Sequence, residues 1–164
     1  MRKTSASSTS PRTLTATPAP NPAAPAATPA STLSDDQMQT LAQSFHDIAF
    51  AIAQVRLDAI TAGATLADPR IVQLQGLVFS LQNAASSFAL QATNLTLANA
   101  DQAVAEISAA TQTADHALDK LKDIDKAVNI ASSVIVLAMA ITTKDMGQIA
   151  NAAKSVIIAA GVSV

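Results

Sequence analysis

The last 37 residues of the chain, residues 128–164, carry only three charged side chains. Two of them are adjacent, Lys144 and Asp145, and they separate two apolar arms. Residues 127–143 contain no charge at all, and residues 146–164 are nearly as apolar. Because so much apolar surface is not left in contact with water, either protein or lipid must cover this segment. The pattern predicts a C-terminal helical hairpin.

The composition favours helices. Hydrophobic residues make up 49% of the 164 residues, aromatic residues only 2%, and the chain has four glycines. This balance is typical of all-α proteins, and the length suffices for one sizeable core. The chain has no cysteine, which rules out disulfides and zinc–thiolate sites.

The beginning of the chain differs from the rest. Six of the seven prolines fall within the first 29 residues, together with three basic residues and no acidic one. Such a segment buries too little apolar surface to offset its ordering entropy, so we expect residues 1–33 to form a disordered tail. No long apolar run follows the basic start, which argues against a Sec-type signal peptide. Residues 34–164 then form the folded part.

Helix boundaries can be predicted from capping residues. A polar cap followed three residues later by Gln marks a helix start. This pattern occurs at Ser34 with Gln37, at Asn99 with Gln102 and at Asp145 with Gln148. Asp68 before Pro69 marks a further start. We predict four helices, over residues 35–62, 69–95, 100–141 and 146–160.

Apolar residues recur at steps of three and four in the first three predicted helices. This is the spacing of helices that pack as a left-handed coiled coil. The third helix exceeds its neighbours by roughly 15 residues, about 22 Å at 1.5 Å per residue, and the excess is the uncharged segment 127–143. The predicted fold is an elongated antiparallel helical bundle or coiled coil of about four helices, with an apolar C-terminal helical hairpin.

The apolar hairpin allows two interpretations. In one it engages or inserts into a lipid membrane, because each arm approaches the length of a membrane-spanning helix. In the other it caps a soluble self-associating coiled-coil scaffold or interaction protein. In overall shape the first resembles α-helical pore-forming toxins and secretion-system translocators, without a shared motif. The candidate residues of the membrane or assembly hairpin are Val128, Ile130, Val134, Ile135, Leu137, Met139, Ile141, Ile149, Val156, Ile157 and Ile158.

The first predicted helix carries apolar side chains away from its heptad seam. Phe50, Leu57 and Ile60 lie on this second face and leave only a narrow polar stripe. One intramolecular seam would not cover both faces, so we expect a partner there. The partner we expect is a second copy of this chain, giving a homo-oligomer, or a related helical subunit.

Few residues suggest chemistry. Asp115, His116 and Asp119 are types that bind metals or relay protons, but their mixed-charge neighbours indicate a solvated helix face. We expect no metal, no cofactor and no enzymatic activity, because no catalytic or phosphate-binding motif is present. Beyond the tail, seven basic and twelve acidic residues make the chain acidic, which argues against nucleic-acid binding. The hairpin favours a secreted or membrane-associated protein over a cytoplasmic one.

Overall fold

The computed structural model describes residues 30–90 and 96–161 of the chain. Most of the predicted tail therefore lies outside the described residues. Over the described part, five helices and two short strands follow one another along the chain. They are β1 (Ala30–Thr32), α1 (Asp35–Thr61), α2 (Pro69–Leu90), β2 (Thr96–Ala98), α3 (Ala100–Leu118), α4 (Ile124–Thr143) and α5 (Met146–Ala159).

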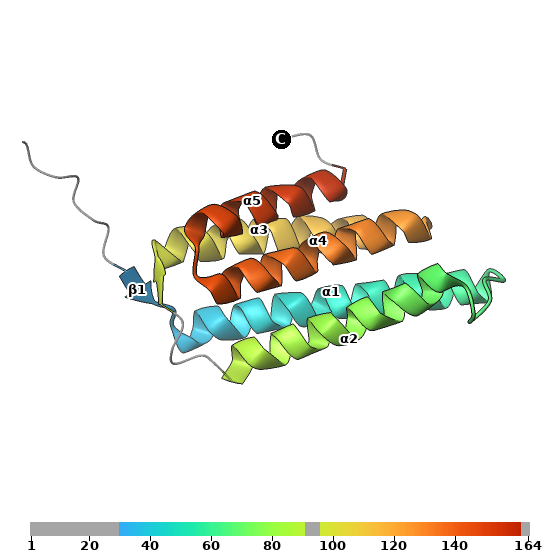
Figure 1. Cartoon of the computed structure of the whole chain (residues 1–164), viewed down its shortest axis with the longest axis horizontal. Coiled ribbons are helices and arrows are strands. Elements are labelled where there is room, and N and C mark those ends of the chain that lie inside the picture. The colour runs from blue at the N-terminus through green and yellow to red at the C-terminus, as the bar shows by residue number, and fades with distance from the viewer. Residues whose placement is uncertain (1–29, 91–95, 162–164) are drawn as a thin grey trace, which may run out of the picture.

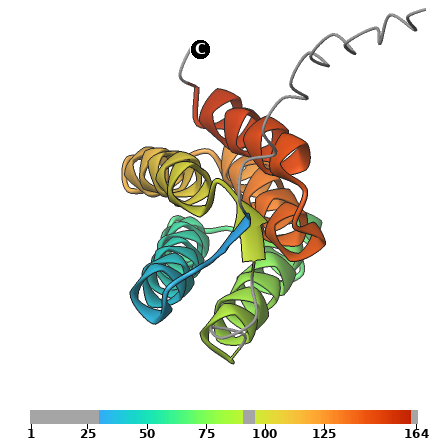
Figure 2. The same ribbon diagram turned by 90° about the vertical axis from the view of Figure 1, so that its left-hand side faces the viewer.

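The helices run alternately up and down the long axis of a bundle (Figure 1). Viewed along that axis, they form a ring in the order α1, α2, α4, α5, α3 (Figure 2). At one end Gln37 Nε2 of α1 donates to Asp101 Oδ1 of α3 (2.9 Å). At the other end Arg70 of α2 pairs with Asp125 of α4 (3.3 Å). The all-α class is thus confirmed, whereas coiled-coil packing stays a prediction.

The hydrophobic core lies inside the ring, along the bundle axis, and contains side chains from all five described helices. The rings of Phe45 of α1 and Phe88 of α2 pack within it, with centroids 5.2 Å apart and ring planes tilted by 40°. At one end β1 and β2 pair antiparallel, with Ser31 opposite Leu97. Leu97 is buried, and so is Leu33, just after β1. The last residues of the predicted tail, 30–33, therefore close the end of the core.

The prediction of one helix over residues 100–141 is wrong. The chain leaves α3 after Leu118 and starts α4 at Ile124. The Asp123 side chain accepts hydrogen bonds from the backbone N–H groups of Asp125 and Lys126, which caps the new helix. The turn folds α4 back along the bundle, so its apolar face joins the core instead of projecting into water.

Two of the three predicted capping pairs are confirmed. Ser34 and Gln37 form a reciprocal capping box at α1, and Asp145 caps α5 while also accepting a bond from Gln148 Nε2 (3.2 Å). The pair at Asn99 is wrong. Asn99 precedes α3 in the left-handed conformation (φ 54°) and makes no side-chain cap bond.

Candidate functional site

The C-terminal hairpin consists of α4 and α5, joined at Lys144 and Asp145. One side of each helix contributes to the core, and six of the predicted hairpin residues are fully buried there: Ile130, Val134, Leu137, Ile141, Ile149 and Val156. Three more are partly buried: Val128, Ile135 and Ile157. Met139 and Ile158 point outward, with 61% and 63% of their surface exposed. The hairpin is therefore both a core component and an outer surface.

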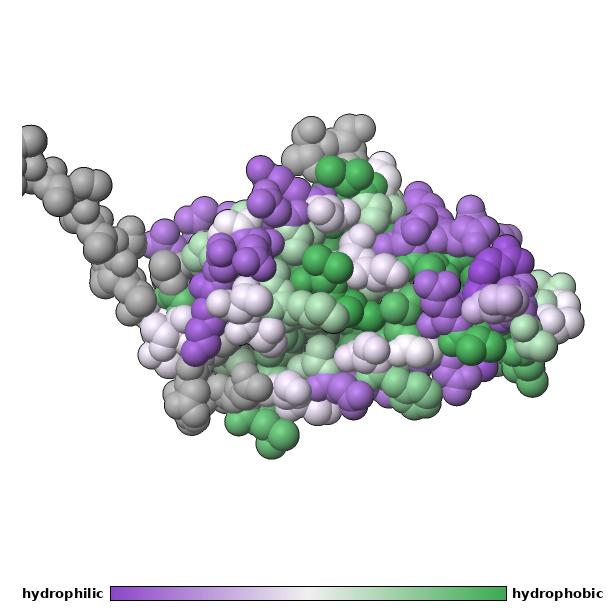
Figure 3. Space-filling model, viewed as in Figure 1, coloured by the Kyte–Doolittle hydropathy of each residue, from purple (hydrophilic) through white to green (hydrophobic). Residues whose placement is uncertain are grey.

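The outer face of α4 carries no charge between its first turn and its end. Val136 is 55% exposed beside Met139, and the other outward side chains there are Ser, Thr and Asn. Figure 3 shows the resulting green and pale surface across the middle of the face formed by α2, α4 and α5. Soluble bundles normally place charged side chains on such a face. Among the described helices, α4 alone has the length and apolar character to cross a membrane.

A shallow groove separates α4 from α2. It has a volume of about 190 Å³ and is lined by small or apolar side chains. Ile135 and Met139 form its α4 wall, and Ser80 and Ala84 belong to its α2 wall. The groove continues the uncharged surface, because α2 has no charged residue after Arg70.

A second apolar surface lies on the α1–α2 hairpin. Phe50 and Leu57 of α1 are exposed as predicted, whereas Ile60 is partly buried. On α2, Val72 and Phe79 are exposed to a similar extent, and sequence reasoning missed them. Their spacing of seven residues was the available signal, because residues seven apart lie on one side of a helix.

Hydrogen bonds of Arg56 fix how these four side chains align. Arg56 donates through Nε to the Ile71 carbonyl (3.3 Å) and through Nη2 to Gln75 Oε1 (3.0 Å). In this antiparallel register, residue 57 lies level with residue 72. Two helical turns further along, residue 50 lies level with residue 79. The exposed apolar side chains therefore fall at two levels of the α1–α2 hairpin, and Phe50 also borders a groove between α1 and α3.

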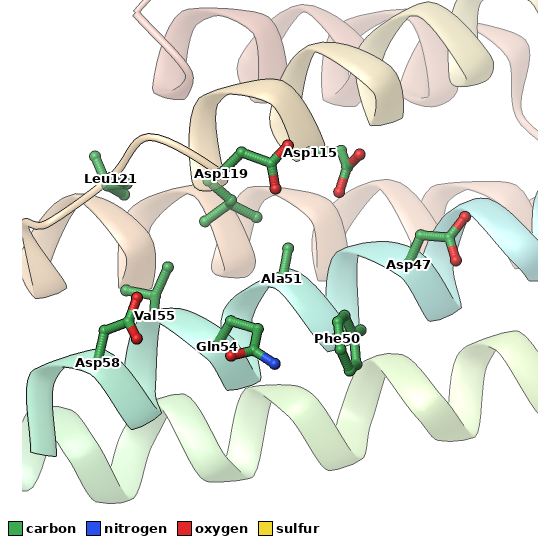
Figure 4. A pocket seen from close by; sticks show the side chains of 10 residues that line it. Asp47, Phe50, Ala51, Gln54, Val55, Asp58, Asp115, Asp119 and Leu121 are labelled. Atoms are coloured by element: carbon green, nitrogen blue, oxygen red, sulfur yellow. The ribbon is translucent and has the colours of Figure 1, made fainter. Parts of the chain in front are cut away.

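An acidic groove of about 340 Å³ runs between α1 and α3 (Figure 4). Asp47 and Asp58 line it from α1, and Asp115 and Asp119 line it from the end of α3. Burial raises the pKa of the Asp115 carboxyl, and the nearby Asp119 and Asp47 raise this pKa further. The groove thus concentrates negative charge on the side of the ring formed by α1 and α3.

The candidate trio of Asp115, His116 and Asp119 does not converge. The two carboxylates line the acidic groove, whereas exposed His116 borders α5. Within the described residues, no group of three or more His, Asp or Glu side chains is arranged to hold a metal ion.

Comparison with known proteins identifies no relative. No protein-family model matches the chain, and neither a curated protein nor a solved structure shows significant similarity.

Proposed function

We propose that this non-enzymatic protein engages membranes through the α4–α5 hairpin, in the manner of a small pore-forming toxin or a toxin component. The carrying observation is that α4 is uncharged around its full circumference over residues 127–143. A helix that serves only as one wall of a soluble bundle needs an apolar stripe on the core side alone. The uncharged outer half of α4 therefore supports contact with a low-dielectric surface.

The hairpin has the features that membrane entry requires. α4 has 20 residues, about 30 Å at 1.5 Å per residue, which matches the hydrocarbon thickness of a bilayer. α5 is shorter, with 14 residues, and Lys154 is its only charged residue. Ser, Thr and Asn side chains within the arms are of the type that bonds between helices in lipid. In the closed bundle the core faces of both helices are covered, so deep insertion requires the hairpin to separate from α2 and α3.

Val136→Asp tests this proposal. Val136 lies near the centre of α4 and is 55% exposed, so an Asp there is tolerated by the closed bundle in water. In hydrocarbon an Asp at a helix centre costs about 3 kcal/mol, which corresponds to roughly 100-fold weaker partitioning. We expect the full chain to float with phosphatidylcholine liposomes and Val136→Asp to stay in the soluble fraction.

The matched control is Val72→Asp, because Val72 is equally apolar and 57% exposed but belongs to α2. Val72→Asp should float like the unaltered chain. Flotation of Val136→Asp, or absence of flotation by the unaltered chain, contradicts the proposal. Deleting residues 127–164 would be a poor test, because it removes core side chains such as Ile130 and Leu137 together with the hairpin.

A further inference from the structure

We propose that the outer face of the α1–α2 hairpin is the contact surface between two copies of this chain. The face is defined by Phe50 and Leu57 of α1 and by Val72 and Phe79 of α2. Each of these side chains has between 54% and 61% of its surface exposed. Large apolar side chains that cluster on an otherwise polar surface mark interaction sites. The face lies on the side of the ring opposite α5 (Figure 2).

The α2 half of this face is uncharged, so two acidic molecules can meet there. The folded part has five more acidic than basic residues, so copies repel one another across most surfaces. The four carboxylates of the acidic groove between α1 and α3 disfavour a self-contact centred on that groove, which Phe50 borders on its α1 side. On the α1–α2 face, α2 has no charge beyond Arg70, whereas α1 has Asp47 and Asp58 at the border with the acidic groove. The guanidinium of Arg56 is held at the junction of α1 and α2 by its bonds to Ile71 and Gln75.

The shape of the face complements itself. One heptad from the level of Phe50 and Phe79 lies a hollow of about 480 Å³ between α1 and α2. Half of its lining residues are small, namely Ala42, Ala85, Ser86 and Ala89, and the other half are polar, namely Gln39, Gln43, His46 and Gln82. Gln43 and Ser86 lie in this hollow, at positions seven residues from Phe50 and Phe79. The face thus carries protruding rings and a hollow side by side.

A two-fold axis can cross the face midway between the level of Phe50 and Phe79 and the level of the hollow. It then puts the rings of each copy into the hollow of the other. Such an isologous contact uses the same patch twice, as closed dimers do. Paired helices of 22 residues extend about 33 Å and together cover about 20 Å in width, or roughly 650 Å² per copy. A stable interface buries about 800 Å² per partner, and at least about 600 Å², so the face is large enough.

The test is the mass of the full chain in sedimentation equilibrium, alone and as variants. We expect a dimer for the unaltered chain and a monomer of unchanged helicity for Phe79→Asp. Ser86→Trp fills the hollow without adding charge and should weaken dimerisation at least tenfold. Val136→Asp changes an equally exposed apolar residue outside this face and should remain dimeric.

Several results would overturn the inference. A monomeric unaltered chain at about 100 μM, or a dimeric Phe79→Asp, excludes this face as the contact. If Ser86→Trp is fully dimeric, the Phe rings of one copy do not lie in the hollow of the other. The dimer contact is independent of membrane engagement, and Val136→Asp distinguishes dimerisation from liposome flotation. It should abolish flotation and spare the dimer, whereas Phe79→Asp should do the reverse.

Discussion

At the residue scale, the ionised carboxylate of Asp115 is destabilising in the folded chain. Its pKa is raised by burial and by Asp119 and Asp47, so the folded chain binds its proton more tightly than the unfolded chain does. Stability contributed by the protonated form is therefore lost as pH rises through the raised pKa. We expect Asp115→Asn to increase the free energy of unfolding at pH 7, by less than about 1 kcal/mol because the groove is open to solvent.

Urea unfolding at two pH values measures this effect. The gain from Asp115→Asn should vanish near pH 3, below the ordinary Asp pKa of about 3.9, where the carboxyl is protonated in both states. A gain that is equal at pH 7 and pH 3 would mean that packing, and not charge, is responsible. Asp36→Asn, on an exposed residue outside the groove, is the control and should show no comparable gain.

The helix-capping residues show how far local sequence predicts local structure. Ser34 with Gln37 and Asp145 with Gln148 could be recognised as caps, because a short polar side chain bonds the first free N–H groups locally. Asn99 has the same spacing to Gln102, yet it adopts a left-handed backbone after β2 and does not cap. Asn99 directly follows β2, whose pairing with β1 joins residues far apart in the chain, and local spacing does not reveal that contact.

At the scale of elements, the turn between α3 and α4 contains two Asp residues, Asp119 and Asp123, that differ in their expected effect on stability. Asp123 caps α4, so Asp123→Ala should lower the free energy of unfolding by about 1 kcal/mol. Asp119 lies in the acidic groove with its like-charged neighbours, so Asp119→Ala should be neutral or slightly stabilising. Urea midpoints of the two variants give the comparison. Equal destabilisation by both would contradict the assigned cap.

The same turn explains the main error of prediction at this scale. Neither Gly nor Pro interrupts residues 77–146, and an apolar repeat continues through Leu121 and Val128. Local pattern therefore favours one long helix. The chain instead breaks at the charged segment because folding back buries the inner face of α4. That gain depends on the whole bundle, whereas the apolar character of the hairpin could be read directly from the sequence.

At the scale of the whole molecule, the hairpin cannot serve the core and the membrane at once. Its buried side chains pack against the other helices, so insertion would expose apolar faces of α1, α2 and α3 to water. Burial of the hairpin in hydrocarbon must compensate for this exposure. The candidate membrane segment could thus be predicted from composition, but its place in a closed core is a property of the assembled fold.

Locking the bundle tests whether opening is required. The chain has no cysteine, and Ala84 of α2 and Ala138 of α4 line the same groove, so an Ala84→Cys/Ala138→Cys chain can be joined by a short bismaleimide. Because the linked chain cannot release α4 from α2, we expect it to lose liposome flotation. Each single-cysteine variant, treated with the same reagent, should float normally. If the linked chain also floats, engagement uses the outer face of α4 in the closed bundle, and the hairpin does not need to leave the core.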